Sequence, residues 1–253
     1  MNPCYKVTIA HAVTSENGTR YGQPGNQTYN MYNTTGELRF SDWYMSGNKP
    51  WTVVLRAKKR SQRIAIASAA VAAVKNHKIG YDQHTRETLY DAVQYKRFDP
   101  DQVEYPVNCD CSSLVTVCCN YAGIPILRGT YTGNLYNRAD AVGMFRIYKT
   151  TKHRSSQDAL EVGDILLRVG HHTVIVVNTM FHMCNELKLG SVGNDVKALQ
   201  VALNEWIAAD LVIDGEFGFK TDDALRRYQI TRHLKNDGIM GELTSTSMGF
   251  LWR

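Results

Sequence analysis

An eight-residue pattern occurs twice near the end of the chain, and it constrains the fold of that region more than any other feature. The two copies, 214–221 and 237–244, both read D-G-x-x-G-x-x-T. In each copy the Asp-Gly pair predicts a turn, the second Gly permits a positive φ, and the Thr is placed to cap a following helix. The repeat therefore predicts two turn–helix units of the same kind.

Residues before and between the two copies of the repeat add to the resemblance described below. They are Val196, Leu199, Gln200 and Leu203 before the repeat, and Tyr228-Gln229 between its copies. From about Leu187 to Met248 the chain resembles the small three-helix peptidoglycan-binding domain of bacterial and phage cell-wall enzymes. The resemblance implies bacterial peptidoglycan as a partner. An unrelated helical bundle that uses the same helix caps is the alternative.

Length and composition favour a globular protein with room for two domains. The chain has 253 residues, of which 43% are hydrophobic, and no apolar run approaches the roughly 20 residues of a membrane span. The first residues, Met1 to Lys6, lack the charged and then apolar segments of a secretory signal. We therefore expect no membrane insertion, and synthesis in a host cytoplasm followed by action on the cell wall, as for phage lysis proteins.

Positive charge is concentrated before residue 187. Residues 187–253 contain 8 basic and 9 acidic residues, which leaves 21 basic against 15 acidic residues in the rest of the chain. A basic domain attracts polyanions such as nucleic acid or teichoic acid, but a solvated basic face is the more common explanation. We therefore expect no nucleic-acid partner. The sequence leaves the oligomeric state open.

The six cysteines predict neither a disulfide framework nor a metal site. Four of them lie between 109 and 119, and no export signal places the chain in an oxidising compartment. Zinc is the alternative, but C-x-C followed by the adjacent Cys118 and Cys119 does not match the usual spacing of zinc ligands. We expect these two cysteines on a buried helix as small apolar residues, and we expect no metal and no cofactor.

Apolar periodicity predicts several elements before the cysteine cluster. Residues 1–60 are rich in turn residues and receive no role, although 51–55 is a plausible strand. A helix is expected from Ser61, as its N-cap, through Val74, with small residues that favour close packing. A second helix is expected over 85–95, followed by a loop over 97–108.

Cys111 is the strongest candidate nucleophile. Apolar spacing predicts a helix from Cys111 to Ala122, which Gly123 and Pro125 end. A thiol in the first turn lies beside free N–H groups and the positive end of the helix dipole, which favour a thiolate. The same N–H groups can stabilise an oxyanion. A buried cysteine without chemistry is the alternative.

A histidine on a strand is the expected base. Gly163-Asp164 precedes an apolar run at 165–167, a turn is expected at Gly170, and 171–177 reads as a second strand of a hairpin. Because side chains alternate along a strand, His171 and His172 point to opposite faces. Only one of them can face Cys111.

The cysteine and histidine segments together resemble a known family. D-C-S-S-L-V at 110–115 is close to the D-C-S-G-L-V box of NlpC-type cysteine peptidases, and G-D-I-L-L at 163–167 with H-T-V-I at 172–175 is close to their second motif. The resemblance spans about 78–186 and implies a papain-like α+β fold, with Cys111 as nucleophile and His172 as base. Ser113 replaces the usual Gly, as also occurs in the related CHAP class.

The third member of the site is expected opposite His172. If the strand turns at Asn178-Thr179 and returns antiparallel, Asn185 faces His172 and can orient its imidazole. A longer turn would bring Glu186 there instead, and another register would bring His182.

Three further residues are candidates for substrate binding. Tyr81 resembles the tyrosine that precedes the family's cysteine box, although it lies thirty residues upstream and could be a core residue. Asp110 could bind a free amine of the stem peptide or simply cap the helix, and Ser113 lies beside it in the same motif.

These observations predict a papain-like cysteine peptidase domain over 1–186 and a small all-α peptidoglycan-binding domain over 187–253. The function expected is that of a phage-type endolysin that cuts an amide bond in the stem peptide of the cell wall. One alternative is an N-acetylmuramoyl-L-alanine amidase of CHAP type, with the same chemistry on another bond. The other is a non-catalytic wall-binding or virion protein.

Overall fold

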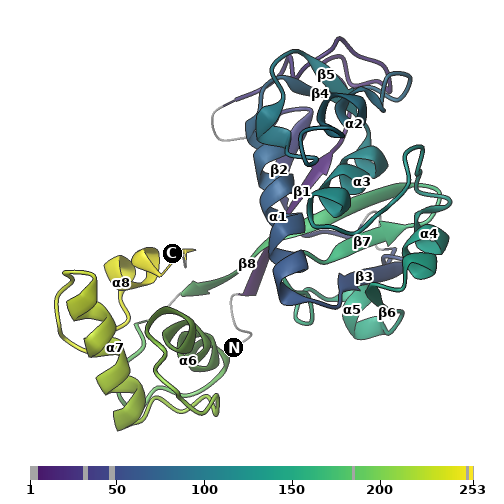
Figure 1. Ribbon diagram of the computed structural model, residues 1–253. Coiled ribbons are helices and arrows are strands. Elements are labelled where there is room, and N and C mark those ends of the chain that lie inside the picture. The colour runs from purple at the N-terminus through teal and green to yellow at the C-terminus, as the bar shows by residue number, and fades with distance from the viewer. Residues whose placement is uncertain (1–4, 31–33, 46–48, 184–185, 249–250, 253) are drawn as a thin grey trace. The chain divides into compact units, whose positions relative to one another are not determined.

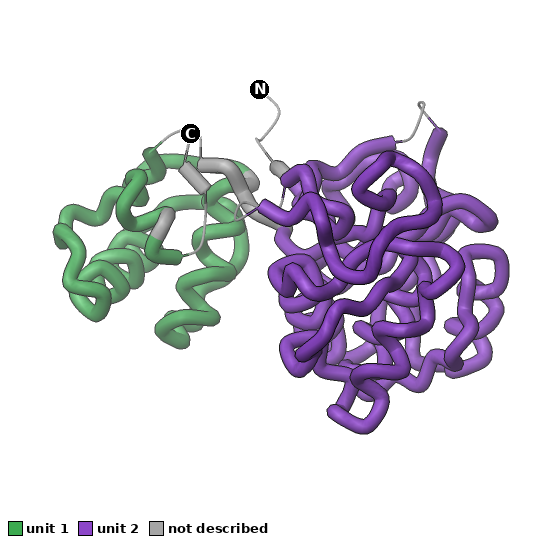
Figure 2. Tube along the Cα trace, turned by 90° about the horizontal axis from the view of Figure 1, so that it is seen from above, with its two compact units in different colours: residues 1–6, 180–253 green, residues 7–179 purple. Residues whose placement is uncertain are grey.

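The computed structural model describes residues 5–30, 34–45, 49–183, 186–248 and 251–252. The chain forms two compact units (Figure 2). Residues 7–179 make the N-terminal unit, and residues 180–253 with 1–6 make the C-terminal unit. The N-terminal unit mixes helices with a mostly antiparallel sheet, and the C-terminal unit is mainly helical, as the sequence predicts at this level.

The N-terminal unit is built on one sheet with the strand order β2-β1-β8-β7-β3-β6. Its strands are β1 (Tyr5–Ala12), β2 (Leu38–Asp42), β3 (Val53–Ala57), β6 (Phe145–Tyr148), β7 (Ile165–Arg168) and β8 (His172–Met183). The pairs β1–β2, β3–β6, β3–β7 and β7–β8 are antiparallel. All five residues of β3 are buried, as expected for a strand with neighbours on both sides and helices over it.

Two helices cover one face of this sheet (Figure 1). They are α1 (Arg60–Lys75) and α3 (Cys111–Tyr121), which pack against each other. The buried face of α1 carries Ala69, Ala70 and Ala73, and these small side chains permit the close packing that the sequence predicts. The expected cap is wrong, because α1 begins after Lys59 with no side-chain cap, so Ser61 lies inside the first turn.

The segment between these helices is more ordered than a loop. It contains β4 (Ile79–Tyr81), α2 (Thr88–Val93), the 3-10 turn η2 (Pro100–Gln102) and β5 (Val107–Cys109). Strands β4 and β5 form a separate parallel pair. The helix expected over 85–95 is therefore shorter, and the expected loop over 97–108 ends in a strand. After α3 come α4 (Leu135–Val142), β6 and α5 (Thr151–Ser155).

The described residues among 1–60 contribute three strands to the sheet. They supply β1, β2 and β3, and they are tied to the rest of the unit by the buried carboxylate of Glu37. This carboxylate accepts hydrogen bonds from the backbone N–H of Gln27 at 2.8 Å and of Tyr81 at 2.7 Å. The turn-rich sequence is explained by the long connections between these strands.

The hairpin of β7 and β8 is confirmed, with Arg168 opposite His172. The second turn, expected at Asn178-Thr179, is wrong, because β8 continues without interruption to Met183. The residues after His172 keep a strong strand propensity, and β1 is the other neighbour of β8 in the sheet. The partner of His172 must therefore come from β1 and not from a returning strand.

The described residues of the C-terminal unit form three helices around a small core. They are α6 (Asn194–Ile207), α7 (Phe219–Thr231) and α8 (Glu242–Ser247), and the pair β8–β9 (Leu251–Trp252) extends from the end of β8. The apolar residues that the sequence singles out all belong to this core, namely Val196, Leu199, Leu203 and Tyr228.

Two buried glutamines explain the repeated sequence. The side-chain amide of Gln200 donates to the Asp214 carboxylate, the Glu216 carbonyl and the Thr221 hydroxyl, and its oxygen accepts the Gly215 N–H at 2.9 Å. Gln229 makes the same four bonds to the second copy, with the Gly238 N–H at 3.0 Å. The fixed Asp, Gly and Thr of the pattern are thus the partners of one buried amide.

The threonines of the repeat do not cap helices, so this expectation is wrong. Helix α7 begins after Gly218, which makes no side-chain cap, and Thr221 lies inside its first turn. Its hydroxyl faces the buried Gln200 amide. Satisfying a buried amide outweighs capping, because an unpaired polar group in a core costs more than a water-exposed helix end.

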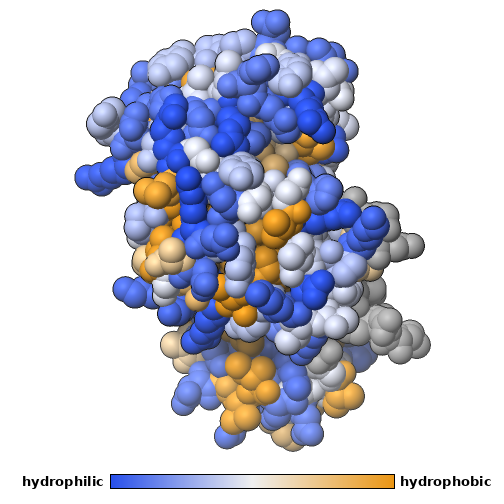
Figure 3. Space-filling view, turned by 90° about the vertical axis from the view of Figure 1, so that its right-hand side faces the viewer, coloured by the Kyte–Doolittle hydropathy of each residue, from blue (hydrophilic) through white to orange (hydrophobic). Residues whose placement is uncertain are grey.

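Within the described residues, no helix is long and apolar enough to cross a membrane. On the face shown in Figure 3, hydrophobic residues lie in several separate patches among hydrophilic ones.

Candidate functional site

Cys111 is the first residue of α3, as the sequence predicts. The Asp110 carboxylate before it accepts the N–H groups of Ser112 at 2.9 Å and Ser113 at 2.7 Å. In return, the Ser113 hydroxyl accepts the Asp110 N–H at 2.8 Å. This reciprocal capping box fixes the start of the helix and the direction in which the Cys111 side chain leaves it.

Asp110 and Ser113, the two substrate-binding candidates closest to Cys111 in the sequence, both take part in this cap. Besides its two amide bonds, Asp110 forms an ion pair with Arg86 at 2.8 Å, and Arg86 also reaches the Ser112 hydroxyl at 3.2 Å. The structure therefore places Asp110 and Ser113 in the helix start, with the Asp110 charge balanced by Arg86. The helix-cap interpretation of Asp110 describes this geometry.

Tyr81 lies close to Cys111 in space although it is thirty residues upstream. The parallel pair β4–β5 puts Tyr81 beside Cys109, two residues before the thiol. Burial raises the pKa of the Tyr81 phenol to about 12, with smaller contributions from Cys111 and Asp110. Its hydroxyl accepts a hydrogen bond from Gln83 at 2.9 Å. The pairing of β4 with β5 therefore brings Tyr81 near Cys111 despite the thirty residues between them.

The start of β8 meets the start of α3. The backbone N–H of Thr173, the residue directly after His172, acts on the Cys111 thiol and opposes the rise of its pKa. His172 is partly exposed and lines a surface pocket, whereas Cys111 is buried. The segment that carries His172 thus begins close to the start of α3, and the pairing of the Cys111 and His172 side chains stays a prediction.

His11 is the residue next to His172 that the sequence analysis missed. Its Nδ1 lies 3.1 Å from Nε2 of His172, and its Nε2 lies 2.9 Å from the Ser41 hydroxyl. His11 comes from β1, which lies beside β8, and Ser41 comes from β2, on the other side of β1. The available signal was a histidine inside the strand-like sequence Tyr5–Ala12, in phase with Val7 and Ile9.

The hairpin register that would bring a third residue back to His172 is not formed. Asn185 lies outside the described residues. The turn that would bring Asn185, Glu186 or His182 back to His172 is absent, because β8 is continuous from His172 to Met183. Glu186 is exposed.

Burial sets the charge states of the site. It lowers the pKa of His11 to about 3, together with the charges of His172 and Arg39. It also lowers the pKa of His172 to about 4; Arg39 acts in the same direction and Asp110 opposes it. Both imidazoles are therefore neutral at neutral pH, and His172 is available as a proton acceptor.

The expectation of a lowered thiol pKa is wrong. Burial raises the pKa of Cys111 to about 12, and the Asp110 carboxylate adds to the effect. The N–H groups of Thr173 and Ser112 oppose this rise but do not cancel it. The resting pair is therefore a thiol beside a neutral imidazole, because removal from water outweighs the helix N-terminus.

Asp164, from the Gly-Asp pair of the second motif, stabilises the sheet. Asp164 is fully buried and receives two hydrogen bonds of 2.7 Å from the guanidinium of Arg56 on β3. This bidentate pair holds the start of β7 against β3. The motif thereby fixes the hairpin that carries His172.

The remaining described cysteines are core residues. Cys109, Cys118 and Cys119 are free and fully buried, and burial raises the pKa of each. The prediction that Cys118 and Cys119 are small apolar residues of a buried helix is confirmed. Cys4 and Cys184 lie outside the described residues. In the part of the chain that the structure describes, no three His, Cys, Asp or Glu side chains are arranged to hold a metal ion.

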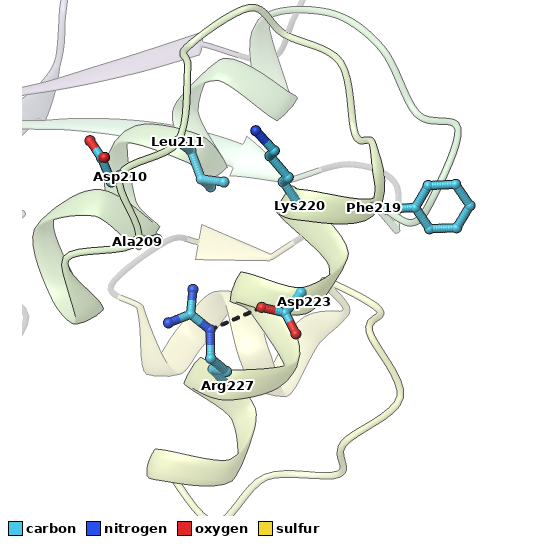
Figure 4. A pocket seen from close by; sticks show the side chains of 7 residues that line it. All are labelled: Ala209, Asp210, Leu211, Phe219, Lys220, Asp223 and Arg227. Carbon is cyan, nitrogen blue, oxygen red and sulfur yellow. Dashed lines mark ion pairs between the residues drawn. The ribbon is translucent and has the colours of Figure 1, made fainter.

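The C-terminal unit has a surface pocket of about 330 Å³ beside α7 (Figure 4). Its polar lining includes Lys220 and an ion pair between Asp223 and Arg227 at 3.1 Å. Leu211 supplies apolar surface, and the Phe219 ring points away from the other side chains with 81% of its surface exposed. An exposed aromatic ring beside charged groups is a suitable surface for a polar polymer.

Comparison with known proteins finds two families along the chain. Residues 9–181 match the family described as endolysin-like domain, and residues 192–248 match the family described as putative peptidoglycan binding domain. Among solved structures, the N-terminal domain of SleB is 31% identical over 27% of this chain and 93% of its own, with a TM-score of 0.26. No curated protein matches.

The two families agree with each other, since both are connected with the bacterial cell wall. They support a cell-wall lytic protein with peptidoglycan as its partner, and they leave the catalytic type open. The first match covers more than half of the chain and includes Cys111, His172 and His11. The chain therefore belongs to the endolysin-like domain family.

Proposed function

We propose that this protein is a cysteine-dependent peptidoglycan hydrolase of phage-endolysin type that cuts an amide bond in the stem peptide. The observation that carries the proposal is the row of hydrogen bonds from His172 to His11 and from His11 to Ser41, with Thr173, the next residue after His172, acting on the Cys111 thiol. A nucleophile, a base and a group that orients the base are the parts that covalent amide hydrolysis requires.

The proposal assigns Nδ1 of His172 as the nitrogen that accepts the thiol proton. If Nε2 of His172 donates its proton to Nδ1 of His11, then His11 donates from its own Nε2 to the Ser41 hydroxyl. Nδ1 of His172 is then unprotonated and available to the thiol. His11 stays neutral because it is buried, and it can stabilise the imidazolium that forms when His172 accepts a proton.

The first half of the reaction forms a thioester. His172 takes the thiol proton while Sγ of Cys111 attacks the carbonyl carbon of the substrate amide. The Asp110 cap uses the Ser112 and Ser113 amides, which leaves the Cys111 N–H to stabilise the oxyanion. When the C–N bond breaks, His172 returns the proton to the leaving amine.

The second half releases the acid. His172 removes a proton from water, the hydroxide attacks the thioester carbon, and the C–S bond breaks to give a carboxylic acid and the free thiol. Because Cys111 starts as a thiol with a raised pKa, proton transfer to His172 accompanies the attack in place of a preformed ion pair. No metal or organic cofactor takes part in these steps.

The C-terminal unit is proposed to hold the enzyme on the wall. Its match to a putative peptidoglycan binding domain supports this role. Attachment to a polymer raises the effective concentration of scissile bonds around the N-terminal unit. The pocket beside Phe219 and Arg227 is the proposed contact surface.

Mass spectrometry of digested sacculi tests the proposal. The wild-type chain should generate new amino and carboxyl termini within the stem peptide, and those termini identify the bond. Cys111→Ala should abolish these products, whereas Cys119→Ala should retain them, since Cys119 is a core residue of the same helix. Cleavage that persists in Cys111→Ala, or that depends on added metal, would exclude the cysteine mechanism.

A further inference from the structure

A second feature beside His172 has no part in the mechanism above. It is a pocket of about 330 Å³ on the N-terminal unit, and His172 forms part of its wall. Its polar lining consists of Lys49, Arg168 and His171, and its remaining walls are Val13, Tyr44 and Trp51. Whatever occupies this pocket lies next to the base of the proposed reaction.

The charge of the pocket has one sign. None of the seven described residues that line it is acidic, while Lys49 and Arg168 are both basic. Arg39 adds to this positive field, because its charge acts on His172 and Tyr44. The carboxylate whose charge acts on His172 is that of Asp110, which is paired with Arg86. An anion in the pocket would therefore meet attraction without an opposing carboxylate in the lining.

Lys49 is the side chain best placed to hold that anion. It is exposed, and it has no ion-pair partner among the residues that the structure describes. The aromatic wall of the pocket is held in place, since Trp51 is buried and its indole N–H donates to the Tyr44 carbonyl at 3.1 Å. A lysine without an ion-pair partner in a pocket with aromatic walls suits a small charged group attached to a chain, such as the carboxylate of a peptide.

We infer that this pocket is a subsite for a free carboxylate of the stem peptide, held by Lys49 beside the scissile amide. The inference rests on the proposed function for its choice of substrate, and it adds a specificity that the catalytic residues do not give. Stem peptides carry carboxylates that some cell walls convert to carboxamides. The subsite would make the enzyme sensitive to that modification.

Binding measurements on the full chain test this subsite without cleavage. Cys111→Ala is titrated calorimetrically with stem peptides that are identical except that one carboxylate at a time is converted to the carboxamide. For one of these positions the acid should bind about fivefold more tightly than the amide, as expected for one ion pair near the surface. Lys49→Met should remove most of this preference, and Lys49→Arg should keep it.

The control is Lys152→Met, which removes an exposed lysine of α5 in the same unit. It should leave the preference unchanged. Equal binding of every acid and amide, no binding of either, or an equal loss for both in Lys49→Met would overturn the subsite. Cleavage by the wild-type chain is measured separately. Acid preference without cleavage would leave the subsite standing and remove the proposed function, and cleavage without acid preference would do the reverse.

Discussion

Nε2 of His172 lies 3.1 Å from Nδ1 of His11, although 161 positions separate the two residues in the chain. The contact joins the first strand of the N-terminal unit to its last, and in the proposed mechanism it leaves the other nitrogen of His172 for the thiol. If His11 orients the base, His11→Ala should lower kcat by about 100-fold with little change in KM, because it acts on proton transfer and not on ground-state binding.

The matched variants for this test are His11→Asn and His77→Ala. Asparagine can accept one hydrogen bond from His172 and should restore part of kcat. His77 is exposed and should be silent. Steady-state kinetics on a soluble muropeptide, with circular dichroism as the folding check, decides the matter. A loss in His11→Ala that appears only in KM would remove the orienting role.

The pH dependence of kcat/KM should reflect a neutral His172. Since burial lowers the pKa of His172 to about 4, the imidazole remains a base well below its ordinary range. The acid side of the kcat/KM profile, which reports groups of the free enzyme, should therefore reach half its maximum near pH 4, where an unperturbed histidine would give a value near 6.5. A half-maximum near 6.5 would show that His172 is not the base of the proposed mechanism.

Acid should also destabilise the fold through the same two histidines. His11 and His172 have pKa values of about 3 and about 4 in the folded protein, below the ordinary value of 6.5. Between these values the unfolded chain binds more protons, so the free energy of unfolding falls as the pH falls below about 6.5. Denaturant unfolding between pH 7 and 4 should show this slope, and His11→Asn should make it shallower.

Asp110 should not select substrates by a free amine. Its charge is balanced by Arg86 and its oxygens cap α3. Peptides with free and acetylated amino termini should therefore have KM values within about twofold of each other, since a balanced carboxylate gives little net attraction. In Arg86→Gln the carboxylate loses its partner, and the free-amine peptide should become preferred. Arg128→Gln breaks an exposed ion pair elsewhere and serves as the control.

The two equivalent glutamines of the C-terminal unit allow a test in which the second copy of the repeat is the control for the first. Gln200→Ala removes the acceptor of the Gly215 N–H and leaves several buried polar groups unpaired, at a cost of about 1–3 kcal/mol. Amide hydrogen exchange at Gly215 should accelerate more than exchange at Gly238, which is bonded to Gln229. Equal acceleration at both glycines would mean that the domain opens as a whole.

The structural features that the sequence predicted correctly are those that depend on residues close together in the chain. The start of α3 at Cys111 follows from its capping box, the β7–β8 hairpin follows from a turn between two apolar runs, and the core of the C-terminal unit follows from helical spacing. In each case the residues that determine the element lie within a few positions of it.

The features that the sequence did not predict depend on distant segments. His11 becomes a neighbour of His172 only because β1 lies beside β8 in the sheet, and no local pattern encodes that pairing. The raised pKa of Cys111 is a second case, because helix position can be inferred from sequence and complete burial cannot. The turn expected at Asn178 failed for the same reason, since the sheet holds β8 extended.

The position of β1 beside β8 also sets an order of events during synthesis. A ribosome makes β1 first, and the sheet cannot close until β8 has emerged some 160 residues later. Pairing across such a separation is slow compared with local helix formation, because the intervening chain must first be brought together. A nascent chain interrupted before β8 carries Cys111 without His172. Under the proposed mechanism such a chain is inert until its N-terminal unit is complete.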